Sequence, residues 1–94
     1  MRVVYSAAAY SDLAQIYAWI ANDTPRNAKS VIDRICDSIE VALAFAPYMG
    51  RRGRAHGTHE WVVRGLPYIV VYRIDDQVDE LRVLAIFHGA QDRR

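Results

Sequence analysis

The sequence predicts an α+β fold in which a hairpin of two helices packs on one face of a small, curved, mainly antiparallel sheet. Two segments before residue 46 carry apolar residues at helical spacing and are joined by a very short connection. After residue 58, three β-branched and aromatic segments alternate with turn-forming residues. A strand before the helices completes the order β-α-α-β-β-β. Residues 1–94 should form a single domain, because 94 residues are too few for two cores.

Composition and charge narrow the class of protein. Hydrophobic residues make up 52% of the chain, enough for a core without disulfides, and the one cysteine excludes an intramolecular disulfide. The first residues turn polar too soon for a signal peptide, and no apolar run is long enough to cross a membrane. With a net charge of only +1, any affinity for nucleic acid must come from a local patch. We expect a small soluble domain in the cytoplasm.

A strand and a helix open the chain. The β-branched and aromatic residues at 2–5 predict a strand, which should lie at an edge of the sheet or beside the last strand. Ser6 can cap the following helix, which should run to about residue 21. The buried stripe expected at i, i+4, i+7 and i+11 consists of Ala9, Leu13, Ile16 and Ile20.

The second helix should begin with Thr24 as its N-cap and Pro25 at its first position, and end near Phe45. Lys29 and Asp33 have the spacing of an i,i+4 ion pair on its exposed side. Its expected buried stripe is Ala28, Ile32, Ile35, Ile39, Ala42 and Ala46. Because the connection between the two helices is so short, they should be antiparallel.

Three further strands are expected at residues 59–64, 68–74 and 80–87, with turns at 65–67 and 75–79. Strict alternation places one set of side chains from the last strand on one face, namely Arg82, Leu84, Ile86 and His88. The other face then receives Leu81, Val83, Ala85 and Phe87. Because neither face is purely polar, we expect the helices to cover one face and the chain's own tail or a partner to cover the other.

Segment 50–74 is the most positively charged part of the chain. It contains five arginines and one acid, whereas residues 1–46 contain four basic and five acidic residues. It opens as a glycine- and arginine-rich loop that contains Arg51, Arg52 and Arg54. These arginines are candidates for contacting a negatively charged partner, and a merely solvated loop is an equally good interpretation.

Arg64, Arg73 and Arg82 are further candidates, because they could line a groove on the sheet that holds a partner peptide. The alternative is that they pair with acids on the sheet, which we favour for Arg82. No cofactor or metal is predicted, since Cys36 and the three histidines match no standard zinc spacing. Cys36 lies among isoleucines and is expected to be a small core residue.

Short motifs follow one another in order along nearly the whole chain. They are Ala9 with Asp12-Leu13 and Ile16, Pro25 with Ala28, Pro47 with Gly50-Arg51, Gly57-Thr58-His59-Glu60, Pro67-Tyr68-Ile69-Val70 with Tyr72-Arg73, and Val83-Leu84 leading to His88-Gly89-Ala90-Gln91. Each motif alone is unspecific, but the ordered set resembles the RelE/ParE superfamily of toxins from type II toxin–antitoxin modules, and most closely its ParE-like branch.

The resemblance implies a cytoplasmic toxin that inhibits growth by poisoning DNA gyrase, so that cleaved DNA accumulates. ParE-like members have no agreed catalytic residues, so we expect no catalysis. A cognate antitoxin, ParD-like or similar, would wrap the toxin and neutralise its arginines. By the same resemblance, the pair would bind promoter DNA only through the antitoxin. His59 departs from the branch, whose members more often carry arginine there.

Two alternatives stay open. RelE-like and YoeB-like members are ribosome-dependent mRNA endoribonucleases, which need an acid, a base and cations around the scissile phosphate. The resemblance places Ile69 and Gly89 at two functional positions of that branch, so catalysis would need His88, Glu60 and Arg73 to converge in an open cleft. We favour a structural role for His88. The second alternative is a degenerate toxin that only binds antitoxin.

Overall fold

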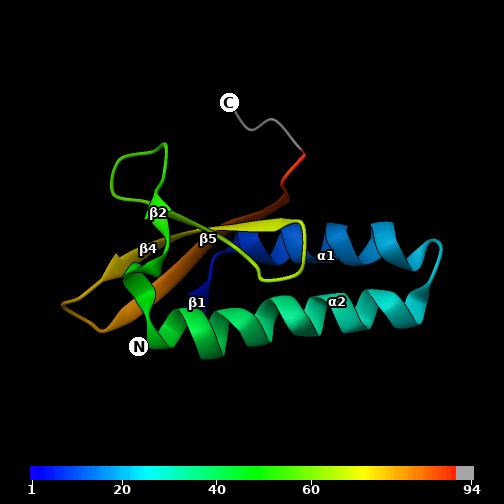
Figure 1. Cartoon of the computed structure of the whole chain (residues 1–94), viewed down its shortest axis with the longest axis horizontal. Coiled ribbons are helices and arrows are strands. Elements are labelled where there is room, and N and C mark those ends of the chain that lie inside the picture. The colour runs from blue at the N-terminus through cyan, green and yellow to red at the C-terminus, as the bar shows by residue number, and fades with distance from the viewer. Residues whose placement is uncertain (91–94) are drawn as a thin grey trace.

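The computed structural model describes residues 1–90 as a helical hairpin packed on a five-stranded sheet (Figure 1). The elements in chain order are β1 (Arg2–Tyr5), α1 (Ala7–Ala21), α2 (Pro25–Asp37), the π-helix η1 (Ser38–Leu43), the 3₁₀-helix η2 (Pro47–Met49), β2 (Arg51–Arg52), β3 (His59–Val62), β4 (Tyr68–Asp75) and β5 (Glu80–His88). The helical hairpin extends beyond the sheet at one end of the molecule, while the β4–β5 turn forms the other end and the β2–β3 loop projects to the side near it (Figure 1). The last residues of the expected covering tail, 91–94, lie outside the described residues.

The sheet has the order β1-β5-β4-β3-β2. β1 pairs in parallel with β5, and the other neighbours are antiparallel. These pairings confirm the α+β class and the expectation that the first strand lies beside the last. β2 is a correction, because we expected Arg51 and Arg52 in a loop. They pair instead with Glu60 and His59 of β3, whose outer edge would otherwise be unpaired.

Of the two N-cap side chains predicted from the sequence, one forms its capping hydrogen bond and the other does not. The Ser6 hydroxyl oxygen accepts a hydrogen bond from the Ala9 amide at 3.0 Å, which confirms this N-cap. The Thr24 side chain makes no capping bond. Its amide instead donates to the Ile20 carbonyl at 2.9 Å, so its backbone closes the end of α1 before α2 begins. Lys29 and Asp33 form the expected ion pair at 2.8 Å.

The buried face of the second helix shifts at η1. Ile35, Ile39 and Leu43 are fully buried, whereas Ala42, which we expected in the core, is exposed. A π-turn accommodates an extra residue, so the side chain that faces the sheet comes one position later than α-helical spacing predicts. The helix ends at Phe45 as predicted, but its winding over Ser38–Leu43 is π rather than α.

A bulge in β5 reverses the predicted alternation. Tyr72 pairs with Val83 but Val71 pairs with Ala85, which leaves Leu84 as an extra residue. Ile86 consequently joins Leu81 and Val83 on the helix-covered face, where it is buried. The strict alternation assumed for this strand is wrong beyond Val83, because one inserted residue exchanges the two faces.

The N-terminal end of α1 holds the backbone at the bulge. The Ser6 hydroxyl donates to the Leu84 carbonyl at 3.1 Å, and the Asp12 carboxylate accepts from the Ile86 amide at 2.9 Å. β1 ends at Tyr5, and beyond that point these two side chains, rather than a neighbouring strand, hydrogen-bond to the backbone of β5.

None of the helices within residues 1–90 has the length and apolar character needed to cross a membrane.

Candidate functional site

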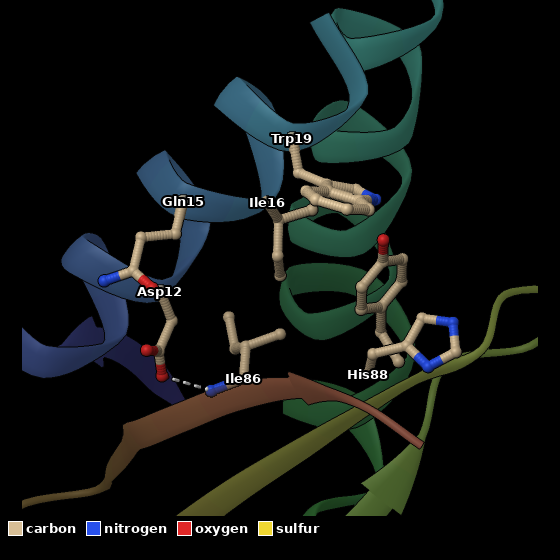
Figure 2. A pocket seen from close by; sticks show the side chains of 7 residues that line it. Asp12, Gln15, Ile16, Trp19, Ile86 and His88 are labelled. Atoms are coloured by element: carbon tan, nitrogen blue, oxygen red, sulfur yellow. Dashed lines mark hydrogen bonds between the residues drawn. The ribbon is translucent and has the colours of Figure 1, made fainter. Parts of the chain in front are cut away.

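A groove of about 540 Å³ opens between α1 and the end of the β4–β5 ladder (Figure 2). It is lined by Asp12, Gln15, Ile16, Trp19, Tyr68, Ile86 and His88. The α1 residues recur about one turn apart, so they form a single stripe along the helix. The strand residues reach the same side because the bulge has turned Ile86 and His88 toward α1.

The floor of the groove is apolar and firmly packed, while its wall is exposed. Tyr68 and Ile86 belong to the core, and burial raises the pKa of the Tyr68 hydroxyl. Trp19, on α1, lies across the groove from Ile86 (Figure 2), and its side chain is 81% exposed. An exposed indole beside a concave apolar surface is typical of a binding site for another protein.

Asp12 and His88 are polar residues of the groove whose side chains accept hydrogen bonds from backbone amides. Asp12 is bonded to the Ile86 amide, as the dashed line in Figure 2 shows. His88 Nδ1 accepts a hydrogen bond from the Ala90 amide at 3.0 Å, and its ring packs edge-on against Tyr68 with centroids 5.5 Å apart. This bond uses Nδ1 as an acceptor, which leaves Nε2 as the ring nitrogen that can donate.

The basic loop, a name we use for residues 51–57 and thus for β2 together with the turn that follows it, is shaped by hydrogen bonds. One Glu60 oxygen accepts from the Arg51 guanidinium at 3.2 Å, and the other accepts from the Arg54 amide at 3.3 Å. The Thr58 hydroxyl donates to the Ala55 carbonyl at 2.6 Å, and the Gly53 amide donates to the Thr58 carbonyl at 2.8 Å. The loop therefore has a defined shape although most of it is exposed.

A buried tyrosine anchors the start of this loop. The Tyr72 hydroxyl donates to the Pro47 carbonyl at 2.6 Å and accepts from the Gly50 amide at 3.1 Å. Burial raises the pKa of this hydroxyl. Position 50 requires glycine, because a Cβ there would lie 2.4 Å from the Tyr72 hydroxyl oxygen. His59 stacks on Tyr72, with ring centroids 5.4 Å apart.

The predicted binding arginines do not form one site. The side chains of Arg52 and Arg54 are exposed and make no hydrogen bond or ion pair with another residue in the range 1–90. The Arg73 guanidinium donates to the His56 carbonyl at 3.3 Å and thus links β4 to the basic loop. Arg64 lies apart beside α2, since its carbonyl accepts from Arg34 at 3.4 Å.

Arg82 pairs with Glu80, two residues earlier in β5, at 3.0 Å. The other Glu80 oxygen binds Arg2 at 2.9 Å. These two cations, Arg2 foremost, hold the pKa of Glu80 below its ordinary value. Arg82 faces Arg73 directly across the ladder, so the sheet surface left uncovered by the helices carries two neighbouring cations.

The alternative catalytic set does not converge. His88 lies on the helix-covered face, whereas Glu60 and Arg73 lie on the opposite face. His88 pairs with Tyr68, five residues before Arg73 along β4, which is a distance of roughly 17 Å. Within residues 1–90, no group of three or more His, Cys, Asp or Glu side chains could hold a metal ion. Cys36 is half-buried against the core, and burial raises the pKa of its thiol.

Sequence reasoning missed the groove, and Trp19 and Gln15 were not among its candidates. One signal was present, because Asp12 and Trp19 lie at i−4 and i+3 from Ile16, a member of the expected buried stripe of α1. The strand half of the groove could not be foreseen, since it depends on the bulge at Leu84.

Comparison by sequence finds one family model and one similar protein. A sequence model of the family described as "ParE toxin of type II toxin-antitoxin system, parDE" matches residues 3–93. A protein of Sinorhizobium fredii named "Putative toxin Y4kP" is 37% identical over 90 residues, covering 96% of this chain and 90% of that protein.

Solved structures of low sequence identity share the fold. A chain of the chromosomal ParDE system from P. aeruginosa has a TM-score of 0.80 at 20% identity and covers 94% of this chain and 95% of its own length. A chain of the RelBE2 toxin–antitoxin complex from Mycobacterium tuberculosis has a TM-score of 0.71 at 24% identity, with 93% and 95% covered. A chain of the intact E. coli RelBE complex has a TM-score of 0.67 at 12% identity, with 97% and 98% covered. Fold, motif order and the match over residues 3–93 agree, and the chain belongs to the ParE family of type II toxin–antitoxin toxins.

Proposed function

We propose that this ParE-family toxin poisons DNA gyrase through its basic loop and is neutralised by a cognate antitoxin that fills the groove beneath α1. The observation that carries the proposal is the separation of two surfaces. One is a cationic loop with unpaired guanidinium groups among the described residues, and the other is an apolar groove with an exposed tryptophan.

The loop supports the gyrase part of the proposal. Arg52 and Arg54 are available to an anionic partner, and the loop that carries them is held in shape by Glu60, Thr58 and Tyr72. A prearranged cationic loop binds phosphate or carboxylate groups without first being ordered. Because His88, Glu60 and Arg73 lie apart, the geometry favours inhibition by docking over RNA cleavage by these residues.

The groove supports the antitoxin part. Its floor can receive one large apolar side chain, and Trp19 can close over that side chain. Two of the similar structures, those from M. tuberculosis and E. coli, are toxin–antitoxin complexes, so partners of this fold are known for those proteins. An antitoxin long enough to continue onto the open sheet face would also neutralise Arg73 and Arg82.

The test is a plasmid cleavage assay with purified gyrase, ATP and toxin freed of antitoxin. We expect linear plasmid to accumulate, and the double variant Arg52→Ala/Arg54→Ala to need at least about tenfold more protein for the same effect, because each charge-assisted contact contributes about 1.5–3 kcal/mol. The double variant Arg26→Ala/Lys29→Ala is the matched control, since it also removes two exposed positive charges, from α2 rather than from the loop, and should behave as wild type.

Absence of linear plasmid at a large excess of toxin would refute the gyrase target. Cut mRNA on translating ribosomes that disappears with His88→Ala would then favour the endoribonuclease. Expression without growth inhibition would favour the degenerate toxin.

A further inference from the structure

The two edges of the sheet differ in how they are protected against pairing with another chain. β2, at one edge, is short and consists of two arginines, and short charged edge strands pair poorly with other chains. β1, at the other edge, carries a Val-Val-Tyr run that favours extended structure. Its one charged residue, Arg2, is bound to Glu80 at 2.9 Å. The β1 edge is therefore the one that can accept a further strand.

The backbone groups on the outer side of β1 belong to Val3 and Tyr5. The amides of Arg2 and Ser6 donate toward β5, each at 2.9 Å, and backbone groups alternate in direction along a strand. The N–H and C=O groups of Val3 and Tyr5 consequently face away from β5, and they have no backbone partner within residues 1–90. Groups that repeat about 6.5–7 Å apart along an edge are satisfied in series by an extended chain.

A row of carboxylates lies beside this edge on the helix side of the sheet. The Tyr5 hydroxyl donates to Glu40 Oε2 at 2.8 Å, which places η1 against β1. Asp33, Asp37 and Glu40 are exposed and follow i, i+4, i+7 spacing, so they form one row, which we call the acidic flank. Burial first, and then these three carboxylates, raise the pKa of the Cys36 thiol beside them.

The charge of the acidic flank defines the partner that fits this edge. Lys29 pairs with Asp33 only, so within residues 1–90 Asp37 and Glu40 have no cation in an ion pair. Every second side chain of an added strand points to the helix side, where Lys or Arg would meet these carboxylates. In a two-fold pair of β1 strands, both helix layers would lie on the same face of one continuous sheet. The acidic flanks of the two copies would then repel each other, which disfavours a second copy.

We propose that an extended segment of the antitoxin adds to the outer edge of β1 and directs Lys or Arg side chains, at alternate positions, to the acidic flank. The inference rests on the proposed function for the identity of the partner. It adds a contact separate from the groove beneath α1, because no residue of β1 or of the acidic flank lines that groove.

Amide hydrogen exchange measured by NMR tests the backbone contact, on the free toxin and on the toxin saturated with purified cognate antitoxin. In the free toxin the Val4 amide, which faces β5, should exchange slowly, whereas the Val3 and Tyr5 amides should exchange fast. Antitoxin should slow exchange at Val3 and Tyr5 by at least about tenfold. The antitoxin segment that becomes protected at the same time should contain Lys or Arg at alternate positions.

The outcomes separate this inference from the proposed function. Antitoxin that binds but leaves the Val3 and Tyr5 amides unprotected would overturn the inference and leave the groove as the antitoxin site. Antitoxin that does not bind would refute both. Protection of the two amides in the free toxin at high concentration would indicate a second copy and overturn the inference, as would a protected antitoxin segment without basic residues.

Charge removal tests the acidic flank. Asp37→Asn/Glu40→Gln keeps the side-chain shapes and an acceptor for the Tyr5 hydroxyl, and should weaken antitoxin binding about threefold to tenfold in calorimetry at low salt. The loss should disappear at about 0.5 M salt. Asp23→Asn/Asp76→Asn is the matched control, since it removes two exposed carboxylates from the α1–α2 connection and the β4–β5 turn and should bind as wild type does. Equal affinities for the two double variants would contradict a basic segment at this edge.

Discussion

The groove beneath α1 and the basic loop are built by different forces. The groove takes its shape from the core, because its floor residues Tyr68 and Ile86 are themselves core residues. The basic loop contributes almost nothing to the core and is held by hydrogen bonds from Glu60, Thr58 and Tyr72. The two surfaces should therefore recognise partners in different ways.

An apolar pocket with an aromatic wall acts at short range and mainly sets how slowly a complex dissociates. Exposed guanidinium groups act at longer range, speed association and lose their effect as salt is added. We infer that an antitoxin would be retained chiefly through the groove, whereas an anionic target would be captured first through the loop.

The largest effect is expected on antitoxin binding when the exposed indole of Trp19, which forms the wall of the groove, is removed. Trp19→Ala should weaken binding of the cognate antitoxin by at least about thirtyfold, because a buried interface tryptophan typically contributes about 2 kcal/mol or more. Isothermal titration calorimetry with purified antitoxin measures this change. Tyr17→Ala is the control, since Tyr17 is exposed on α1 but does not line the groove. Equal losses from both variants would show that the groove is not the principal contact.

A smaller effect, on stability, should follow from removing the hydrogen bonds that join the basic loop to the buried Tyr72 hydroxyl. Tyr72→Phe removes the hydroxyl that donates to the Pro47 carbonyl and accepts from the Gly50 amide. The variant should lower the free energy of unfolding by about 1–3 kcal/mol. Urea denaturation measures it. Tyr68→Phe is the matched control, because the Tyr68 hydroxyl has no hydrogen bond to another residue within 1–90, and it should cost less than about 0.5 kcal/mol. A loop held independently of the core would make the two variants equal.

The smallest effect concerns the polar cluster at the start of β5. The folded pKa of Glu80 lies below its ordinary value of 4.5, chiefly because Arg2 binds the ionised carboxylate. This stabilisation is fully present above the pKa of the unfolded chain and is lost as the pH falls through the folded pKa. Wild type should therefore be more stable than Glu80→Gln at pH 7, and the difference should shrink below about pH 4.5. Melting temperatures at a series of pH values test this, and a constant difference would contradict the assigned pKa shift.

The sequence predicted most of the fold because its signals are local. Ser6 before an apolar stripe, Pro25 at a helix start and β-branched runs between turns each depend on a few neighbouring residues. The sequence left open whether the first strand lies at an edge of the sheet or beside the last strand, and β1 does both. Its parallel pairing with β5 was not predicted, since pairing between distant segments has no local signature.

The candidate sites were less predictable. The arginines of the basic loop were identified from charge alone, but charge could not show that Arg51 is bound to Glu60 while Arg52 and Arg54 stay exposed. The groove was missed because its residues come from α1, β4 and β5 and meet only after folding.

The sequence by itself determined the α+β class, the order of the two helices and of every strand except β2, the basic segment and the family, because periodicity, turn residues and motif order are carried by the chain. Only the tertiary structure decided which side chains share a surface. One extra residue at Leu84 exchanged the faces of β5, and one π-turn at Ser38–Leu43 exchanged Ala42 for Leu43 in the core. Both changes shift a side-chain period by a single residue, and such shifts are decided by packing against neighbouring elements rather than by local preference.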